Sequence, residues 1–188
     1  MSLQPSVFVS PEAYLAYERQ ANHKSEYVNG TIVAMVGASE KHNLIVWNLL
    51  GILYNQMRGR SCKAYGNDMR VKVEETGLYT YPDVVAICGE ARFEDEQQDT
   101  LVNPGVLIEV LSPSTEACDR GAKFAHYRSI ETLREYVLIA QDTSRVELYE
   151  RQADNRWLLT DARHVRDVIQ LPSIDCILRL SEVYERVV

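Results

Sequence analysis

The sequence predicts a single domain of the α/β class, or more broadly α+β, in which helices cover a central mixed β-sheet. Two short, continuous apolar runs, Tyr81–Cys88 and Val106–Leu111, are typical of central strands that are covered on both faces. Segments with helical spacing of apolar residues lie before and after these runs, as expected when helices pack on a sheet. The chain has neither a repeat nor a flexible linker, so residues 1–188 are expected to fold together.

Capping and turn residues predict the first three elements. Residues 10–12, Ser-Pro-Glu, are typical of the N-cap and first turn of a short helix. The pair Asn29-Gly30 between two β-prone segments predicts a hairpin over residues 25–35, because both positions of its turn favour a positive φ. Apolar residues at helical spacing then predict a longer helix over residues 42–57.

Strands and helices follow one another through the rest of the chain. Val71 and Val73 alternate with charged residues, which is typical of a half-buried strand, and the acidic segment Glu90–Asn103 is expected to be an exposed loop. The elements predicted are strands over Cys62–Glu74, Tyr81–Cys88 and Val106–Leu111, a helix over Thr115–Ile130, a strand over Glu135–Ala140, a hairpin of Arg145–Tyr149 with Trp157–Leu159, and a closing helix over Leu180–Val187.

Charge and apolar content limit the classes of partner. The formal net charge of −7 argues against a broad basic surface that binds nucleic acid without help. A bound divalent cation and a local basic cleft are compatible with that charge. No apolar run approaches the roughly 18 residues of a membrane span, and the N-terminus lacks the features of a secretion signal. We therefore expect a cytoplasmic protein with no membrane partner.

The cysteines predict neither a zinc site nor a disulfide framework. Cys62, Cys88, Cys118 and Cys176 form no CxxC pair, and no histidine stands at zinc-ligand spacing from them. Disulfide frameworks are typical of shorter, secreted chains. We therefore expect four free thiols, most of them buried.

Two acidic residues stand out in the predicted central strands. Asp83 follows Pro82 at the start of an apolar strand, where a carboxylate can face a cleft. Glu109 lies inside an apolar strand, and burying an unpaired carboxylate costs several kcal/mol. A divalent cation would compensate this charge; the alternative is a buried pair with an arginine or a lysine.

Phosphodiester hydrolysis requires this combination of groups. Two carboxylates from adjacent strand ends hold Mg²⁺, or Mn²⁺ in its place, and leave other metal positions to water and the substrate phosphate. The metal lowers the pKa of its water and neutralises charge in the transition state. Asp119, Lys123 and Tyr127 are spaced i, i+4, i+8 on the next helix and therefore share one face. Lys123 is expected to reach back toward Glu109 and to assist the water or the transition state.

Several blocks of this sequence, taken together and in their order, resemble one known family. These blocks are Glu26-Tyr27-Val28-Asn29-Gly30, His42-Asn43-Leu44, Tyr81-Pro82-Asp83-Val84-Val85, Ile108 through Thr115, Asp119 with Lys123 and Tyr127, and Glu135-Tyr136-Val137-Leu138. The chain resembles the Uma2 family (DUF820), which is abundant in cyanobacteria and is a branch of the PD-(D/E)XK nuclease superfamily. The resemblance extends from about Glu12 to Tyr149.

This resemblance implies a restriction-endonuclease-like core with Asp83 and Glu109 as the two motif acids. The superfamily's usual lysine, two residues after the second acid, is replaced here by Leu111. Related branches move that lysine to the following helix, and Lys123 fits such a move. Glu26 matches an N-terminal acidic position that can assist the metal in similar nucleases. A homodimer is expected by analogy with restriction-type nucleases, which often pair subunits to cut both strands.

Four further residues are candidates for substrate binding. Tyr127 shares a helix face with Lys123, and its alternative role is packing. His42, at the start of a helix, is a candidate general base or substrate contact; a histidine at this position is more often a packing or capping residue. Arg70 and Lys72 are candidates for lining the substrate cleft, and the alternative is the solvated face of an alternating strand.

The sequence therefore predicts an Mg²⁺-dependent endonuclease that acts on DNA, with Asp83 and Glu109 holding the metal and Lys123 assisting. A second hypothesis is a catalytically inactive nucleic-acid-binding or oligomeric module on the same fold, which the missing lysine beside Glu109 and the net acidity favour. A third is a metal-free hydrolase that uses the two carboxylates as acid and base, as glycosidases do. The presence of only two tryptophans argues against a sugar cleft.

Overall fold

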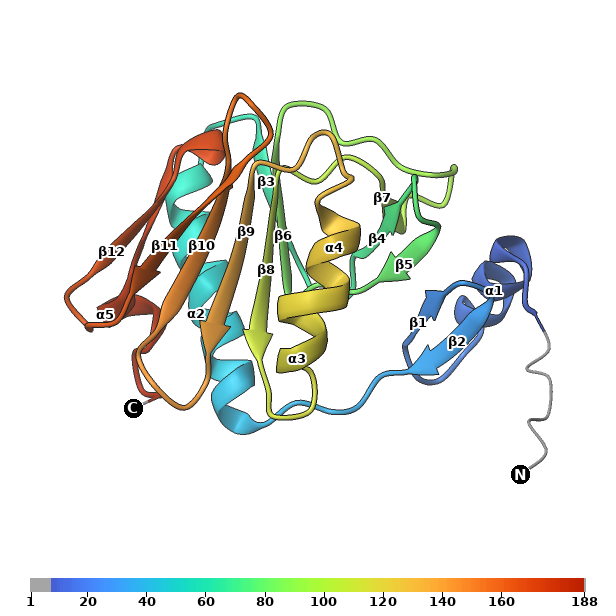
Figure 1. The fold of residues 1–188 in the computed structure, drawn as a ribbon, viewed down its shortest axis with the longest axis horizontal. Coiled ribbons are helices and arrows are strands. Elements are labelled where there is room, and N and C mark those ends of the chain that lie inside the picture. Colours follow the sequence, from blue (N-terminus) through green and yellow to red (C-terminus); the bar gives the residue numbers. More distant parts are fainter. Residues whose placement is uncertain (1–7, 188) are drawn as a thin grey trace.

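A six-stranded mixed sheet forms the centre of the computed structural model, which describes residues 8–187 (Figure 1). The strand order is β11-β10-β9-β8-β6-β3; β8 and β9 are parallel, and the other neighbours are antiparallel. The strands are β3 (Cys62–Gly66), β6 (Val84–Cys88), β8 (Val106–Leu111), β9 (Glu135–Ala140), β10 (Val146–Arg151) and β11 (Trp157–Ala162).

Helices cover both faces of this sheet, as Figure 1 shows, with α2 behind it and α3 and α4 in front. Helix α2 (Glu40–Met57) packs on the face that carries Ile108 and Val110 of β8. On the opposite face Leu107 and Leu111 pack with Tyr127 at the end of the other helical segment. Successive residues of a strand point to opposite faces, so Glu109 lies on the same face as Leu107 and Leu111.

The helical segment after β8 has three parts. They are α3 (Glu116–Cys118), a π-helical turn (Asp119–Lys123) and α4 (Phe124–Tyr127). The wider turn lies at the residues that the sequence singled out, and π-helical turns inside helices frequently occur at functional sites.

A second sheet of five short strands packs on the side of α3 and α4, in the order β2-β1-β5-β4-β7. The rings of Tyr14, Tyr27 and Tyr79 pack against one another and join α1 to this sheet. Asn29 and Gly30 both have positive φ in the β1–β2 turn, as the sequence predicts. The elements are α1 (Pro11–Glu18), β1 (Ser25–Val28), β2 (Thr31–Ala34), β4 (Arg70–Val73), β5 (Leu78–Thr80) and β7 (Thr100–Leu101).

The structure corrects two sequence-based predictions of secondary structure and adds one hairpin. The segment Cys62–Glu74 is not one strand: a turn, in which the amide of Met69 donates to the carbonyl of Gly66, divides it into β3 and β4 of different sheets. The loop Glu90–Asn103 contains the short buried strand β7. A hairpin that the sequence analysis did not identify precedes the last helix. It consists of β12 (Val168–Leu171), a 3₁₀ turn (Pro172–Ile174) and β13 (Cys176–Arg179), and α5 (Leu180–Val183) follows it.

The prediction of four free thiols is wrong for two cysteines. Cys62 and Cys88 lie directly opposite each other in the antiparallel pair of β3 and β6, and they form a disulfide. The sequence pattern does not specify this register, because it depends on the pairing of β3 with β6. Cys118 and Cys176 are free, the first exposed and the second buried. Within residues 8–187, each helix is too short or too polar to span a lipid bilayer.

Candidate active site

A cavity of about 440 Å³ lies at the end of β8, between the first turn of α2 and the segment that contains the π-helical turn. Its position follows from the topology of the chain. The central strand β8 is followed by α3, and residues before and after this junction line the cavity. The cavity brings together four of the predicted site residues and one further acid: His42, Asp83, Glu109, Asp119 and Lys123.

Asp83 is placed beside Glu109 by strand pairing. It immediately precedes β6, whose first residue, Val84, pairs with Ile108 of β8. Its Oδ2 accepts a hydrogen bond of 2.7 Å from the amide of Val110, and its Oδ1 lies 2.8 Å from Nε2 of His42. The backbone and the imidazole therefore fix the orientation of the carboxylate toward the cavity.

Glu109 is the most perturbed acid of the site. Its side chain is nearly fully buried, and its Oε1 accepts a hydrogen bond of 2.8 Å from the hydroxyl of Tyr127. Burial is the largest cause that raises the pKa of Glu109; the charges of Asp83 and Asp119 act in the same direction and Lys123 opposes them, and the net pKa is about 8. Positive charge added beside this carboxyl would lower its pKa and so favour the loss of its proton.

Lys123 is the cation that faces these acids. Its ammonium lies 2.9 Å from Oε1 of Glu26, 3.4 Å from Oδ1 of Asp119 and 3.5 Å from Oε1 of Glu109. Burial alone would lower the pKa of Lys123, but the charges of Glu109, Glu26 and Asp119 outweigh it and raise that pKa. The side chain is therefore a charged group at neutral pH, held among the side chains of three acidic residues.

The second sheet supplies the support for this arrangement. Thr80 of β5 donates a hydrogen bond of 2.5 Å to Oε1 of Glu26, and its hydroxyl lies 3.4 Å from that of Tyr127. Glu26 belongs to β1, which pairs with β5, so the second sheet meets the π-helical turn at Lys123. Tyr127 is completely buried and acts as a link between Glu109 and Thr80.

Two members of this group were not predicted as site residues. Asp119 was noted only for its helix face. It is buried, its Oδ1 has no hydrogen-bond partner among the described residues, and burial raises its pKa. The signal that could have identified it is an acid four residues before a candidate catalytic lysine. Thr80 has no such signal, because its role depends on the pairing of β5 with β1.

Arg70 and Lys72, predicted as candidates for the substrate cleft, do not line the cavity. Arg70 is buried, donates to the hydroxyl groups of Thr100 and Tyr81, and lies 3.0 Å from Asp99. Lys72 pairs with Glu94 at 2.7 Å. Both side chains have contacts that stabilise the second sheet.

The chemistry of the donors fits a hard divalent cation. Carboxylate oxygens are the ligands that Mg²⁺ prefers. All hydrogen bonds and ion pairs that Glu109 makes within residues 8–187 are at Oε1, and Oδ1 of Asp119 accepts no hydrogen bond there, although it lies in an ion pair with Lys123. No three His, Cys, Asp or Glu side chains of the described part form a ready-made metal cluster. Asp83 and Glu109 would therefore supply two ligands, and water and substrate the others.

Comparison with known proteins identifies the family that the chain matches. The family model Uma2, described as "Putative restriction endonuclease", matches residues 11–180. Two uncharacterized proteins of Synechocystis sp. are similar to the chain. Protein sll1609 is 41% identical over 148 residues, which cover 79% of this chain and 84% of that protein. Protein slr1290 is 34% identical over 176 residues, which cover 94% and 91%.

A solved structure has the same fold. It is the crystal structure of "a putative nuclease belonging to DUF820" from Anabaena variabilis, with a TM-score of 0.76 over 96% of this chain and 99% of that one. At 18% identity the similarity concerns the fold. It confirms the predicted class, a mixed sheet flanked by helices in a restriction-endonuclease-like arrangement.

Proposed function

The chain belongs to the Uma2 family, and from this membership we propose that it is a metal-dependent endonuclease that hydrolyses phosphodiester bonds in DNA. One observation carries the proposal: Asp83, Glu109 and Lys123, which lie far apart in the sequence, line the same cavity. An acid pair beside a buried cation is the combination that phosphodiester hydrolysis requires.

Asp83 and Glu109 would hold Mg²⁺ or Mn²⁺, and Asp119 and Glu26 lie close enough to Lys123 to add negative charge near them. When bound, the metal supplies a water of lowered pKa and positive charge toward the phosphate. Glu109 would hold the cation as a carboxylate, because positive charge beside it would oppose the effect of burial on its pKa.

The remaining residues position these groups. His42 and the amide of Val110 orient the Asp83 carboxylate from two sides. The ammonium of Lys123 is the donor available to stabilise charge on a phosphate oxygen, and Glu26 holds it in place. Met35, Val36 and Ala38 line another part of the cavity, where they would exclude water around the substrate.

A catalytically inactive module on the same fold is the second candidate. One observation favours it: the acidic side chains of Glu26, Asp119 and Glu109 already surround Lys123 without substrate. The two candidates differ in whether the acids of the cavity are needed for cleavage.

The test is nicking of supercoiled plasmid DNA with Mg²⁺ or Mn²⁺, comparing the wild type with Glu109→Gln and Asp83→Asn. Glu135→Gln is the matched control, since Glu135 is also a buried strand glutamate with a raised pKa but lies outside the cavity. We expect at least a hundredfold loss for the two cavity variants and near wild-type cleavage for the control. Equal nicking by wild type and Glu109→Gln would refute the proposal.

A further inference from the structure

The outward face of α2 carries two large aromatic side chains. Trp47 is 75% exposed and Tyr54 is 67% exposed. Together with Gly51 and Arg58 they are spaced four, three and four residues apart, so they form one stripe along the helix. The other face of α2 packs on the central sheet. Exposed apolar groups that gather on one face are typical of protein contact sites.

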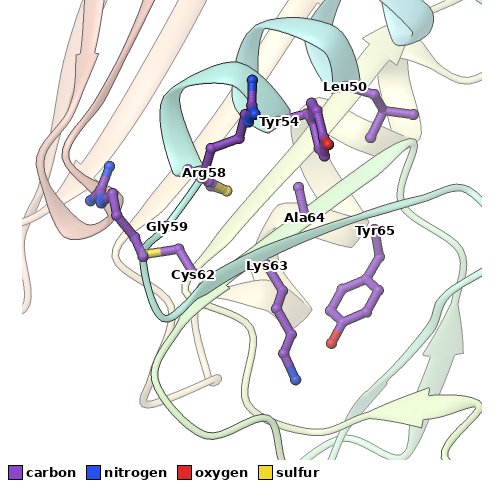
Figure 2. A pocket seen from close by; sticks show the side chains of 10 residues that line it. Leu50, Tyr54, Arg58, Gly59, Cys62, Lys63, Ala64 and Tyr65 are labelled. Carbon is purple, nitrogen blue, oxygen red and sulfur yellow. The ribbon is translucent and has the colours of Figure 1, made fainter.

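A hollow borders this stripe on each side. The first, of about 700 Å³, lies between α2 and the edge strand β3. Figure 2 shows Leu50 and Tyr54 of α2 on one side of it and Ala64 and Tyr65 of β3 on the other. The second, of about 600 Å³, lies between α2 and the segment formed by β13 and α5, and Trp47 lines it. The face thus has both a projecting ridge and depressions beside it.

The charges around the stripe are arranged in a self-complementary way. Between Lys41 and Arg58 the helix has no acidic or basic side chain apart from His42, although the whole chain has a net charge of −7. The rim of the first hollow is basic and that of the second is mainly acidic. The basic rim consists of Arg58, Arg60 and Lys63, and the other rim of Glu182 and Glu185 with Arg179.

We propose that this face binds a second copy of the chain through a two-fold contact centred on Gly51, with Trp47 and Tyr54 as the buried anchors. A two-fold contact places the same patch on both subunits. This patch is complementary to a second copy of itself, because it has a ridge, hollows and rims of opposite charge. The basic rim of one copy would lie near the acidic rim of the other. The uncharged stripe avoids the repulsion that two acidic surfaces would cause.

Gly51 provides a test that leaves the single chain intact. A Cβ added at Gly51 meets no atom within 4 Å, and glycine is a poor helix former, so Gly51→Gln does not disturb the isolated fold. The larger side chain blocks only a partner that approaches the helix closely. Trp47→Gln removes an anchor instead, and Val165→Gln is the matched control, because Val165 is also an exposed apolar residue but lines neither hollow.

The experiment is sedimentation velocity of the full chain over a range of concentrations, with circular dichroism to verify folding. We expect the wild type and Val165→Gln to sediment as dimers at micromolar concentration, and both α2 variants to raise the dissociation constant at least tenfold. A charge swap adds a positive result: Arg58→Glu and Glu182→Arg each weaken the dimer, and the double variant restores it. A monomeric wild type, or folded α2 variants that dimerise normally, would overturn the proposal whatever the outcome of the nuclease test.

Discussion

The ammonium of Lys123 lies 2.9 Å from the carboxylate of Glu26, so a residue of the N-terminal hairpin holds the cation that faces the acids of the central sheet. Glu26 belongs to the second sheet and Lys123 to the π-helical turn, so their contact joins that sheet to the helical segment beside the cavity. Four predictions follow from this arrangement and its neighbours.

Glu26→Gln is expected to lower cleavage while leaving the fold intact. Gln keeps the shape and the hydrogen bond from Thr80 but loses the charge that fixes Lys123, so the ammonium is free to pair with Glu109 instead. We expect a drop in kcat of about tenfold to a hundredfold, within the range typical for one positioned group. Single-turnover plasmid cleavage measures it, and unchanged kcat would exclude Glu26 from the site.

Glu109→Gln is expected to make the metal-free protein less sensitive to alkaline pH. The pKa of Glu109 is raised from 4.5 to about 8, so the folded state binds more protons than the unfolded state between these values. The contribution of Glu109 to the free energy of unfolding is therefore greatest at low pH. It falls by on the order of a few kcal/mol as the pH rises from the unfolded to the folded pKa of Glu109. Gln removes this dependence. Thermal melts in EDTA from pH 5 to 9 should show a difference in Tm that grows with pH in favour of the variant; a constant difference would contradict the assignment.

Thr80→Val is expected to act through Glu26 and Lys123. It removes the hydroxyl that donates to Glu26 without changing the size of the side chain, and the loss of one such bond costs about 1 to 3 kcal/mol. Cleavage should fall because Lys123 loses its fixed position. Thr80→Ser restores the donor, so it should recover most of kcat. A merely structural role would instead lower the Tm of Thr80→Val without separating the activities of the two folded variants.

Arg70→Met is expected to affect stability but not catalysis. Arg70 is buried and its loss leaves Asp99 without one of its two arginine partners, which should cost about 2 to 3 kcal/mol because Asp99 retains part of its hydration. Urea unfolding measures this change. At temperatures where the variant is folded, its plasmid cleavage should equal that of the wild type. A selective loss of DNA affinity would instead indicate that Arg70 contacts the substrate.

The parts of the site that depend on local sequence were predictable. Asp83 after Pro82 and Glu109 within an apolar strand were identified from their own neighbours, and Lys123 from its spacing on the next helix. The contact of Lys123 with Glu109 was expected, and the structure shows it. Its closest partner, Glu26, depends on how β1 pairs with β5, and no local pattern encodes that pairing.

The same distinction holds for the fold. Elements with a strong local signal, such as the Asn29-Gly30 hairpin and the strand Val106–Leu111, were predicted with correct type and position. The division of Cys62–Glu74 was not predicted. The short turn inside this segment moves the chain from one sheet to another without changing the β-prone pattern of its residues. The disulfide between Cys62 and Cys88 was missed for the same reason, since strand register is a property of tertiary structure.

Helix α2 connects the cavity and the outer aromatic stripe without interruption. His42 faces Asp83 in its first turn, and Trp47 points outward five residues later, roughly 7.5 Å along the same axis. A molecule that binds the aromatic stripe and displaces α2 slightly would shift the imidazole of His42, which orients the carboxylate of Asp83. By thermodynamic reciprocity, loading of the cavity would then alter how tightly the outside molecule is held, so assembly and cleavage could be coupled with no moving loop between them.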